Sequence, residues 1–138
     1  MSIQERGFVW PIRVYYEDTD AGGVVYHSNY LNFMERARTE WLRKLGFGQN
    51  QLARESGLVF AVTQMSVRFV APARLDDRLD VSVLVARQGR ASLELTQEIW
   101  RKSDEKLLIQ ATAKIVLLNN RFKPTRFPAP FLAVLESG

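Results

Sequence analysis

The spacing of hydrophobic residues changes once along this chain, and that change restricts the fold more than any other feature of the sequence. Over residues 29–45, apolar side chains recur at the three- and four-residue spacing of one helical face. After Gly57 they alternate with polar side chains at every second residue, as in a strand with one buried face. One long helix and a series of later strands predict a single-domain α+β fold spanning residues 1–138.

The turns between these segments make the expected order more specific. Ser28 or Asn29 can cap the start of the long helix, and Gly46 stands where a C-cap glycine belongs. A shorter helix is expected at residues 49–55, and strands are expected at 10–16, 61–69, 79–85, 93–99 and 107–118. Short turns between consecutive strands require antiparallel pairing. The tail after Asn119 carries three of the five prolines and is expected to lie over the surface.

Composition excludes several classes of protein. The chain has no cysteine, which rules out a disulfide framework, a thiolate nucleophile and cysteine-ligated metal. A single histidine argues against a histidine-based zinc site, so no metal or cofactor is expected. No apolar run has the length of a signal peptide or of the roughly 20-residue span that crosses a bilayer. The sequence therefore predicts a cytoplasmic protein without a membrane span.

Charge narrows the range of partners. The net charge is +4, from 19 basic and 15 acidic residues, and both signs are interspersed along the chain. Nucleic-acid binding is not expected, because there is no basic block, stripe or tail. A phosphorylated small molecule remains compatible, since two or three well-placed cations are enough to bind it.

The segment between the first strand and the long helix contains the residues best suited to chemistry. Glu17, Asp18 and Asp20 lie within four residues of each other, and two glycines and the only histidine, His27, follow. A helix N-terminus presents amide hydrogens without partners and the positive end of the helix dipole, so it can stabilise an oxyanion. Taken alone, such an acidic cluster is more often only a solvated capping segment.

The sequence of this segment resembles a known family. The run D-T-D-A-G-G-V-V-Y-H-S-N-Y, followed by N-F-M-E-R-A-R-T-E-W-L, resembles the hotdog-fold acyl-CoA thioesterases of the 4-hydroxybenzoyl-CoA thioesterase group. The similarity is greatest to the YbgC type associated with Tol-Pal, and it extends over about residues 8–120, including F-V-A-P-A-R-L-D-D at 69–77. The resemblance implies a hotdog fold, in which a curved antiparallel sheet wraps one long central helix.

The resemblance also implies roles for individual residues. Asp20 matches the family's catalytic carboxylate, and the backbone amide of His27 matches the donor that polarises the thioester carbonyl. Asp20 would act either as a nucleophile that forms a mixed anhydride or as a general base for water, and the sequence leaves both routes open. Tyr26 and Asn29 are candidates to line the acyl or pantetheine channel.

Other charged residues have more general interpretations. Arg87 and Arg90 flank the Gln88–Gly89 turn and resemble a position that related enzymes use for nucleotide contact. Glu35 is a rival catalytic carboxylate, because another hotdog lineage uses an acid on the helix. With Arg36 and Arg38 beside it, Glu35 is interpreted instead as part of a surface ion pair.

These observations predict an acyl-CoA thioesterase, with coenzyme A as part of the substrate and not as a cofactor. The family places active sites at a dimer interface and commonly pairs dimers, so a homodimer assembling to a homotetramer is expected. An acyl-thioester hydratase ranks low because His27 is the only histidine. The alternative from another class is a binding or scaffold protein that recognises acyl carrier protein or phospholipid-synthesis enzymes. Membrane-lipid metabolism is implied only through the Tol-Pal-associated relatives.

Overall fold

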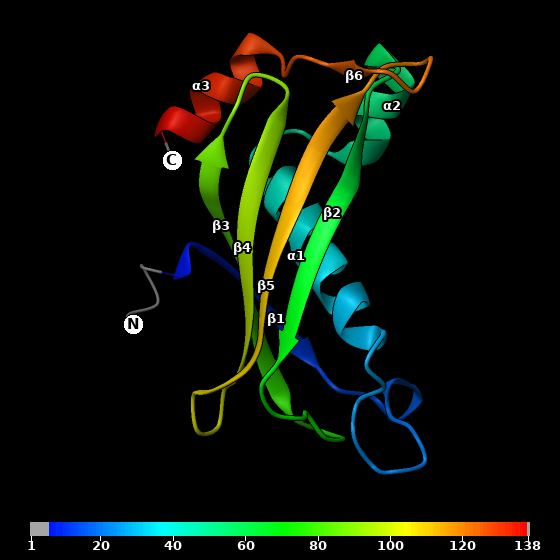
Figure 1. The fold of residues 1–138 in the computed structure, drawn as a ribbon, viewed down its shortest axis with the longest axis vertical. Coiled ribbons are helices and arrows are strands. Elements are labelled where there is room, and N and C mark those ends of the chain that lie inside the picture. Colours follow the sequence, from blue (N-terminus) through cyan, green and yellow to red (C-terminus); the bar gives the residue numbers. More distant parts are fainter. Residues whose placement is uncertain (1–5, 138) are drawn as a thin grey trace.

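The computed structural model describes residues 6–137 and shows one antiparallel sheet curved around a long helix (Figure 1). In chain order the elements are β1 (Phe8–Arg13), the short 3-10 turn η2 (Tyr16–Asp18), α1 (Asn29–Lys44), α2 (Gln49–Ser56), β2 (Val59–Phe69), β3 (Arg78–Gln88), β4 (Ser92–Arg101), β5 (Lys106–Leu118), β6 (Pro124–Thr125) and α3 (Ala129–Ser137). The predicted α+β hotdog architecture is confirmed.

The strands are arranged in the order β1-β3-β4-β5-β2, and β6 pairs with β5. Every pairing is antiparallel, as the short turns predict. Hairpins join β3 to β4 and β4 to β5, while β1 is added beside β3 at one edge. The other edge of this path is β2, an 11-residue strand.

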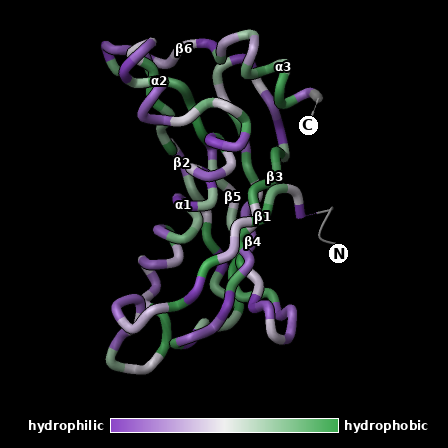
Figure 2. Tube along the Cα trace, turned by 180° about the vertical axis from the view of Figure 1, so that it is seen from behind, coloured by the Kyte–Doolittle hydropathy of each residue, from purple (hydrophilic) through white to green (hydrophobic). Residues whose placement is uncertain are grey.

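The helix α1 forms as its residue pattern requires. Its buried side chains fall on one face, so Figure 2 shows its trace alternating between hydrophilic and hydrophobic colours. The predicted end is also correct, because Gly46 follows the helix with φ +90°, a conformation that glycine adopts at little cost. Ser28 is the N-cap residue, yet its side chain makes no capping hydrogen bond.

Two expectations about the chain ends require correction. The first strand ends at Arg13 and not at residue 16, because the chain turns into η2 to begin the loop. The C-terminal tail does not simply lie over the surface. Phe127 and Phe131 are 4% and 0% exposed and belong to the main hydrophobic core. Pro128 and Pro130 are compatible with α3 because they fall at its start, where a missing amide hydrogen is tolerated.

Within the described residues, no helix has both the length and the apolar character needed to cross a membrane.

Candidate active site

Asp20 begins a tight turn in the segment between β1 and α1. Its amide donates to the carbonyl of Val24 at 2.9 Å, and the amide of Gly23 donates to the carbonyl of Asp20 at 3.1 Å. The turn needs glycine at position 23, where φ is +80°. The amide of Gly22 donates to Asp20 Oδ1 at 2.8 Å, whereas Oδ2 makes no hydrogen bond to a described residue. The exposed carboxylate is therefore held through one oxygen and has the other available.

The backbone amides just before α1 are also available. The amide of Asn29 donates to the carbonyl of Tyr26 at 2.9 Å, and that of Leu31 to Ser28 at 3.1 Å. By contrast, the amides of His27 and Ser28 donate to no described residue, and no side chain caps the helix. Unpaired amides at the positive end of a helix dipole are suited to a developing oxyanion.

Asp18 and Asn29 hold the two ends of the loop together. The Asp18 side chain is 8% exposed, and its Oδ2 accepts a hydrogen bond from the amide of Tyr15 at 2.8 Å. Asn29 Nδ2 donates to the carbonyl of Asp18 at 2.9 Å, and the amide of Tyr26 donates to the same oxygen at 2.9 Å. Asn29 is only partly buried, and its side-chain amide holds the loop against the helix. Its role in lining the substrate channel stays a prediction.

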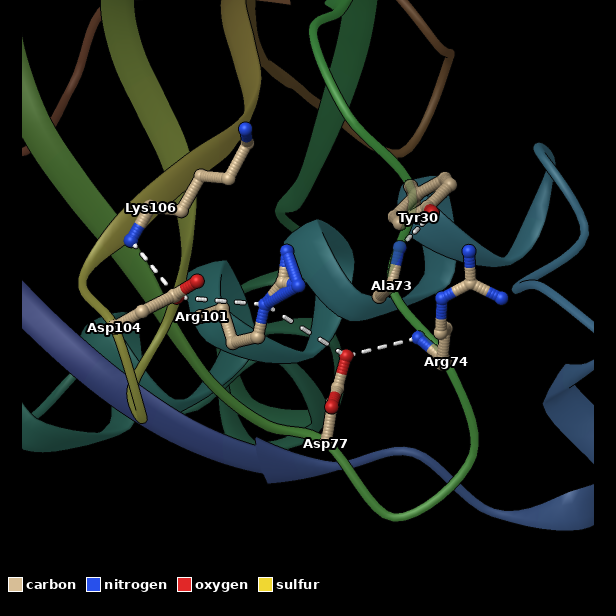
Figure 3. A network of polar contacts seen from close by, with 7 residues as sticks. All are labelled: Tyr30, Ala73, Arg74, Asp77, Arg101, Asp104 and Lys106. Carbon is tan, nitrogen blue, oxygen red and sulfur yellow. Dashed lines mark hydrogen bonds and ion pairs between the residues drawn. The ribbon is translucent and has the colours of Figure 1, made fainter.

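The connection between β2 and β3 braces this loop from the other side. The amide of Val25 donates to the carbonyl of Ala73 at 2.9 Å, and Val24 forms a bridge with Arg74. The amide of Ala73 donates to the hydroxyl of Tyr30 at 2.9 Å, as Figure 3 shows. Tyr30 falls in the apolar stripe of residues 29–45, and nothing in that spacing indicates this polar role.

The environment of Tyr30 links it electrostatically to Asp20. Burial raises the pKa of Tyr30 above its ordinary value, the hydrogen bond from Ala73 opposes that change, and the negative charge of Asp20 adds to it. Asp77 acts in the same direction as Asp20 and Arg101 in the opposite one. Asp77 Oδ2 accepts a hydrogen bond from the amide of Arg74 at 2.9 Å. The same oxygen lies 4.0 Å from Arg101 Nε, so an ion pair joins the β2–β3 connection to the end of β4 (Figure 3).

His27 and Tyr26 present their rings together at the surface. The ring centroids are 4.4 Å apart with an interplanar angle of 38°, and both side chains are exposed. Their position beside the free amides is compatible with contact to a substrate. Among residues 6–137, no three His, Asp or Glu side chains are grouped as metal ligands would be.

Arg87 and Arg90 lie at the opposite end of the long axis from Asp20. They flank the β3–β4 hairpin, at the top of Figure 1, whereas the Asp20 loop is at the bottom. Arg78 and Arg87 are nine positions apart in β3, which is a span of about 30 Å at the usual strand rise. Arg87 borders a hollow of 310 Å³ with Glu94 and Lys114. Within one copy of the chain, the predicted phosphate contacts and the predicted catalytic carboxylate are therefore not brought together.

The interpretation of Glu35 as part of an ion pair with Arg36 or Arg38 is wrong. Glu35 Oε1 accepts from the Thr39 hydroxyl at 3.1 Å, and no ion pair of the described residues includes Glu35. Arg38 is not on the surface but is 9% exposed. The spacing of the helix indicates this burial, because position 38 lies four residues after Met34 and four before Leu42, both of which are buried.

Comparison with known proteins identifies the family. The model of the thioesterase superfamily matches residues 22–108, which is more than half of the chain. The chain belongs to the thioesterase superfamily. It is 44% identical over 125 residues to the acyl-CoA thioesterase YbgC of Haemophilus influenzae, covering 90% of each chain. The predicted resemblance to the YbgC type is confirmed.

Solved structures agree with this assignment of the superfamily. A probable thioesterase from Bartonella henselae superposes with a TM-score of 0.82 at 38% identity, covering 87% of this chain and 98% of that one. A variant of 4-hydroxybenzoyl-CoA thioesterase complexed with 4-hydroxybenzoyl-CoA superposes with a TM-score of 0.87 over 94% of this chain and 99% of that one. The identity to the second is 22%, so that likeness shows the hotdog fold alone.

Proposed function

We propose that this protein is a cytoplasmic acyl-CoA thioesterase that hydrolyses acyl-CoA to a free acid and coenzyme A. The main support is that the same segment contains an exposed carboxylate, Asp20, which accepts a hydrogen bond from the Gly22 amide, and unpaired backbone amides at the start of α1. The relatives named acyl-CoA thioesterase or thioester hydrolase support the same reaction at 44–45% identity.

The unpaired backbone amides at the start of α1 activate the thioester carbonyl toward attack. The amide of His27 polarises the thioester carbonyl and stabilises the oxyanion that forms when the carbonyl carbon is attacked. No reorganisation is needed at that moment, because neither this amide nor that of Ser28 has a partner among the described residues. The exposed ring of Tyr26 forms part of the channel beside it.

Asp20 provides the nucleophile or the general base. Oδ1 holds the Gly22 amide, so Oδ2 is the oxygen that either attacks the carbonyl carbon or removes a proton from water. In the first route the carbon–sulfur bond breaks as a mixed anhydride forms, the thiolate takes a proton from solvent, and water then cleaves the anhydride to the free acid and restores Asp20. In the second route the hydroxide left by water bonds to the carbonyl carbon, the carbon–sulfur bond breaks, and the proton held by Asp20 passes to the departing thiolate. Both roles are compatible with the same carboxylate position, and Asp20→Asn removes both.

If Arg87 and Arg90 bind the phosphates of coenzyme A, they must come from a second copy of the chain, because they lie far from Asp20 of their own copy. We infer that two copies pair across β2, whose outer edge is not paired with another described strand. Long unpaired edges are ready to accept another strand. An antiparallel, two-fold pairing puts the β3–β4 hairpin of one copy at the same end as the Asp20 loop of the other, so Arg87 and Arg90 of a second copy supply the phosphate contacts. Pairs of dimers complete the proposed homotetramer.

The test is thiol release from short, long and aromatic acyl-CoAs by the wild type and by Asp20→Asn. Turnover by the wild type that Asp20→Asn loses supports the proposed reaction and the assignment of Asp20. Turnover retained in the variant removes the assignment of Asp20. If no acyl-CoA is cleaved, thioesters of acyl carrier protein are tested next, and binding to that carrier without cleavage supports the scaffold alternative.

A further inference from the structure

A cavity of 190 Å³ lies between the helices and the edge strand, apart from the Asp20 turn. Its walls come from α1, α2, β2 and β5. The apolar side is lined by Leu42, Phe60 and Ile115, among others, and the polar side by Glu35, Arg38 and Gln49. A cavity of about 150 Å³ already accepts a benzene ring, so this one has room for the end of an acyl group.

Arg38 is the unusual member of the lining. Its Nη1 donates to Gln97 Oε1 at 2.7 Å, and no ion pair of the described residues includes it. Gln97 cannot turn away, because its Nε2 donates to the carbonyls of Met34 and Ser82 at 3.1 and 3.2 Å. A guanidinium has five N–H donors. A side chain more than nine-tenths buried is thus fixed beside a cavity with donors to spare and without a paired acid.

The other charged side chain of the cavity indicates which ligand group suits it. Glu35 lines the same space and carries a negative charge that acts on Arg38. An anionic ligand group would meet Arg38 favourably but would be repelled by Glu35. A neutral hydroxyl satisfies both, because its oxygen accepts from the guanidinium and its proton is donated to the carboxylate.

We propose that this cavity binds a hydroxyl group carried near the far end of the acyl chain, with Arg38 and Glu35 as the residues that determine this specificity. The inference rests on the proposed thioesterase function, in which the thioester carbonyl lies at the start of α1. At 1.5 Å per residue, Glu35 and Arg38 lie about 9 and 13 Å along α1 from Asn29. That separation exceeds one aromatic ring, so the preferred substrates are hydroxylated acyl groups of medium length.

The experiment compares decanoyl-CoA with its ω-hydroxylated derivative. The wild type is expected to cleave the hydroxylated ester with a kcat/KM roughly tenfold higher, which corresponds to one buried hydrogen bond to charged groups. In Glu35→Gln and in Arg38→Lys this ratio falls toward one. Glu40→Gln is the matched control, because Glu40 lies on the same helix, pairs with Arg43 at 2.6 Å and does not line the cavity. In this control the ratio stays as in the wild type.

Several outcomes overturn the proposal. A wild-type ratio of one, or a ratio unchanged in Glu35→Gln, removes the hydroxyl site while leaving the thioesterase function intact. A higher kcat/KM for the ω-carboxylated ester than for the hydroxylated one shows that the cavity takes an anion instead. If the wild type cleaves none of the esters, the proposed function itself fails, and titration calorimetry with the uncleaved esters still tests the cavity. Equal affinities for the plain and hydroxylated esters then overturn the cavity proposal as well.

Discussion

The hydroxyl of Tyr30 accepts a hydrogen bond from the backbone amide of Ala73 at 2.9 Å, and the carbonyl of the same alanine accepts one from Val25. One residue of the β2–β3 connection is thus bonded to the loop that carries Asp20 and to the helix that follows it. Tyr30 is 3% exposed, so water cannot easily replace its hydroxyl. This buried contact therefore braces the loop that carries Asp20.

Tyr30→Phe is expected to lower the free energy of unfolding by about 1–3 kcal/mol, because it leaves the Ala73 amide without its partner in a buried position. Denaturant unfolding measures the change. Tyr16→Phe is the control, since Tyr16 is 81% exposed, and its effect should be small. A Tyr30→Phe variant as stable as the Tyr16→Phe variant would show that the contact does not brace the loop.

Alkaline pH is expected to unfold the wild type through the same residue. Burial raises the pKa of Tyr30 in the folded state, so the neutral phenol is favoured there. The stability that this provides is complete below the unfolded pKa of about 10 and is lost as the pH rises through the folded pKa. Unfolding followed between pH 9 and 12 should therefore show a steeper loss in the wild type than in Tyr30→Phe. Parallel curves would contradict the coupling.

Asp20→Asn is expected to reduce kcat by a factor of about 10²–10⁴ while the loop keeps its shape. The asparagine oxygen can still accept from the Gly22 amide, so the turn is preserved and only the reactive carboxylate is lost. Steady-state hydrolysis and the melting temperature are measured together. Glu17→Gln, which neutralises an exposed acid three residues earlier, is the control. A large fall in melting temperature for Asp20→Asn would mean that structure, and not chemistry, explains lost activity.

Arg87→Gln combined with Arg90→Gln is expected to raise KM for acyl-CoA about tenfold or more and to leave kcat nearly unchanged, because these side chains are proposed to bind remote phosphates. A further measurement mixes this double variant, which is expected to be inactive at low substrate concentration, with Asp20→Asn. If each site combines Asp20 of one copy with the arginines of another, mixed dimers regain one intact site and activity at low substrate recovers. Absence of any recovery in verified mixed dimers would place both functions in one chain.

Gly7→Ala is expected to destabilise the fold by about 2–4 kcal/mol. Gly7 has φ +82°, and a Cβ there would lie 2.6 Å from the carbonyl oxygen of Val83. Gly48→Ala is the matched control, because its φ is −57° and a Cβ would meet nothing within 4 Å. Thermal unfolding of the two variants compares them, and equal melting temperatures would rule out the close approach as a constraint.

The sequence predicted those parts of the fold that depend on local periodicity. The apolar stripe and the terminal glycine locate α1 to within one residue, and alternation locates β2 to β5. The tail was misjudged because its prolines suggested an irregular surface segment. Phe127 and Phe131 nevertheless pack with ring centroids 5.3 Å apart and reach Phe47 and Phe60 in the core.

The candidate site was predictable only as far as it lies in one segment. Asp20 and His27 stand in a recognisable loop, whereas the contact of Tyr30 with Ala73 joins positions that no local pattern connects. Arginine is usually exposed, so its residue type suggests a surface position for Arg38, although position 38 falls in the buried stripe of α1. The assignment of Arg87 and Arg90 rests on likeness of position, and only the three-dimensional arrangement shows that the β3–β4 hairpin lies at the far end of the sheet from the Asp20 loop.

The bond from Ala73 to Tyr30 also constrains when the protein becomes competent during its synthesis. Its two residues are 43 positions apart, and the neighbouring bridge joins Val24 to Arg74. A ribosome releases the chain from the N-terminus, so the segment bearing Asp20 emerges well before the segment that braces it. The first half of the nascent chain therefore carries the Asp20 loop without its brace, which can form only after the β2–β3 connection has left the exit tunnel.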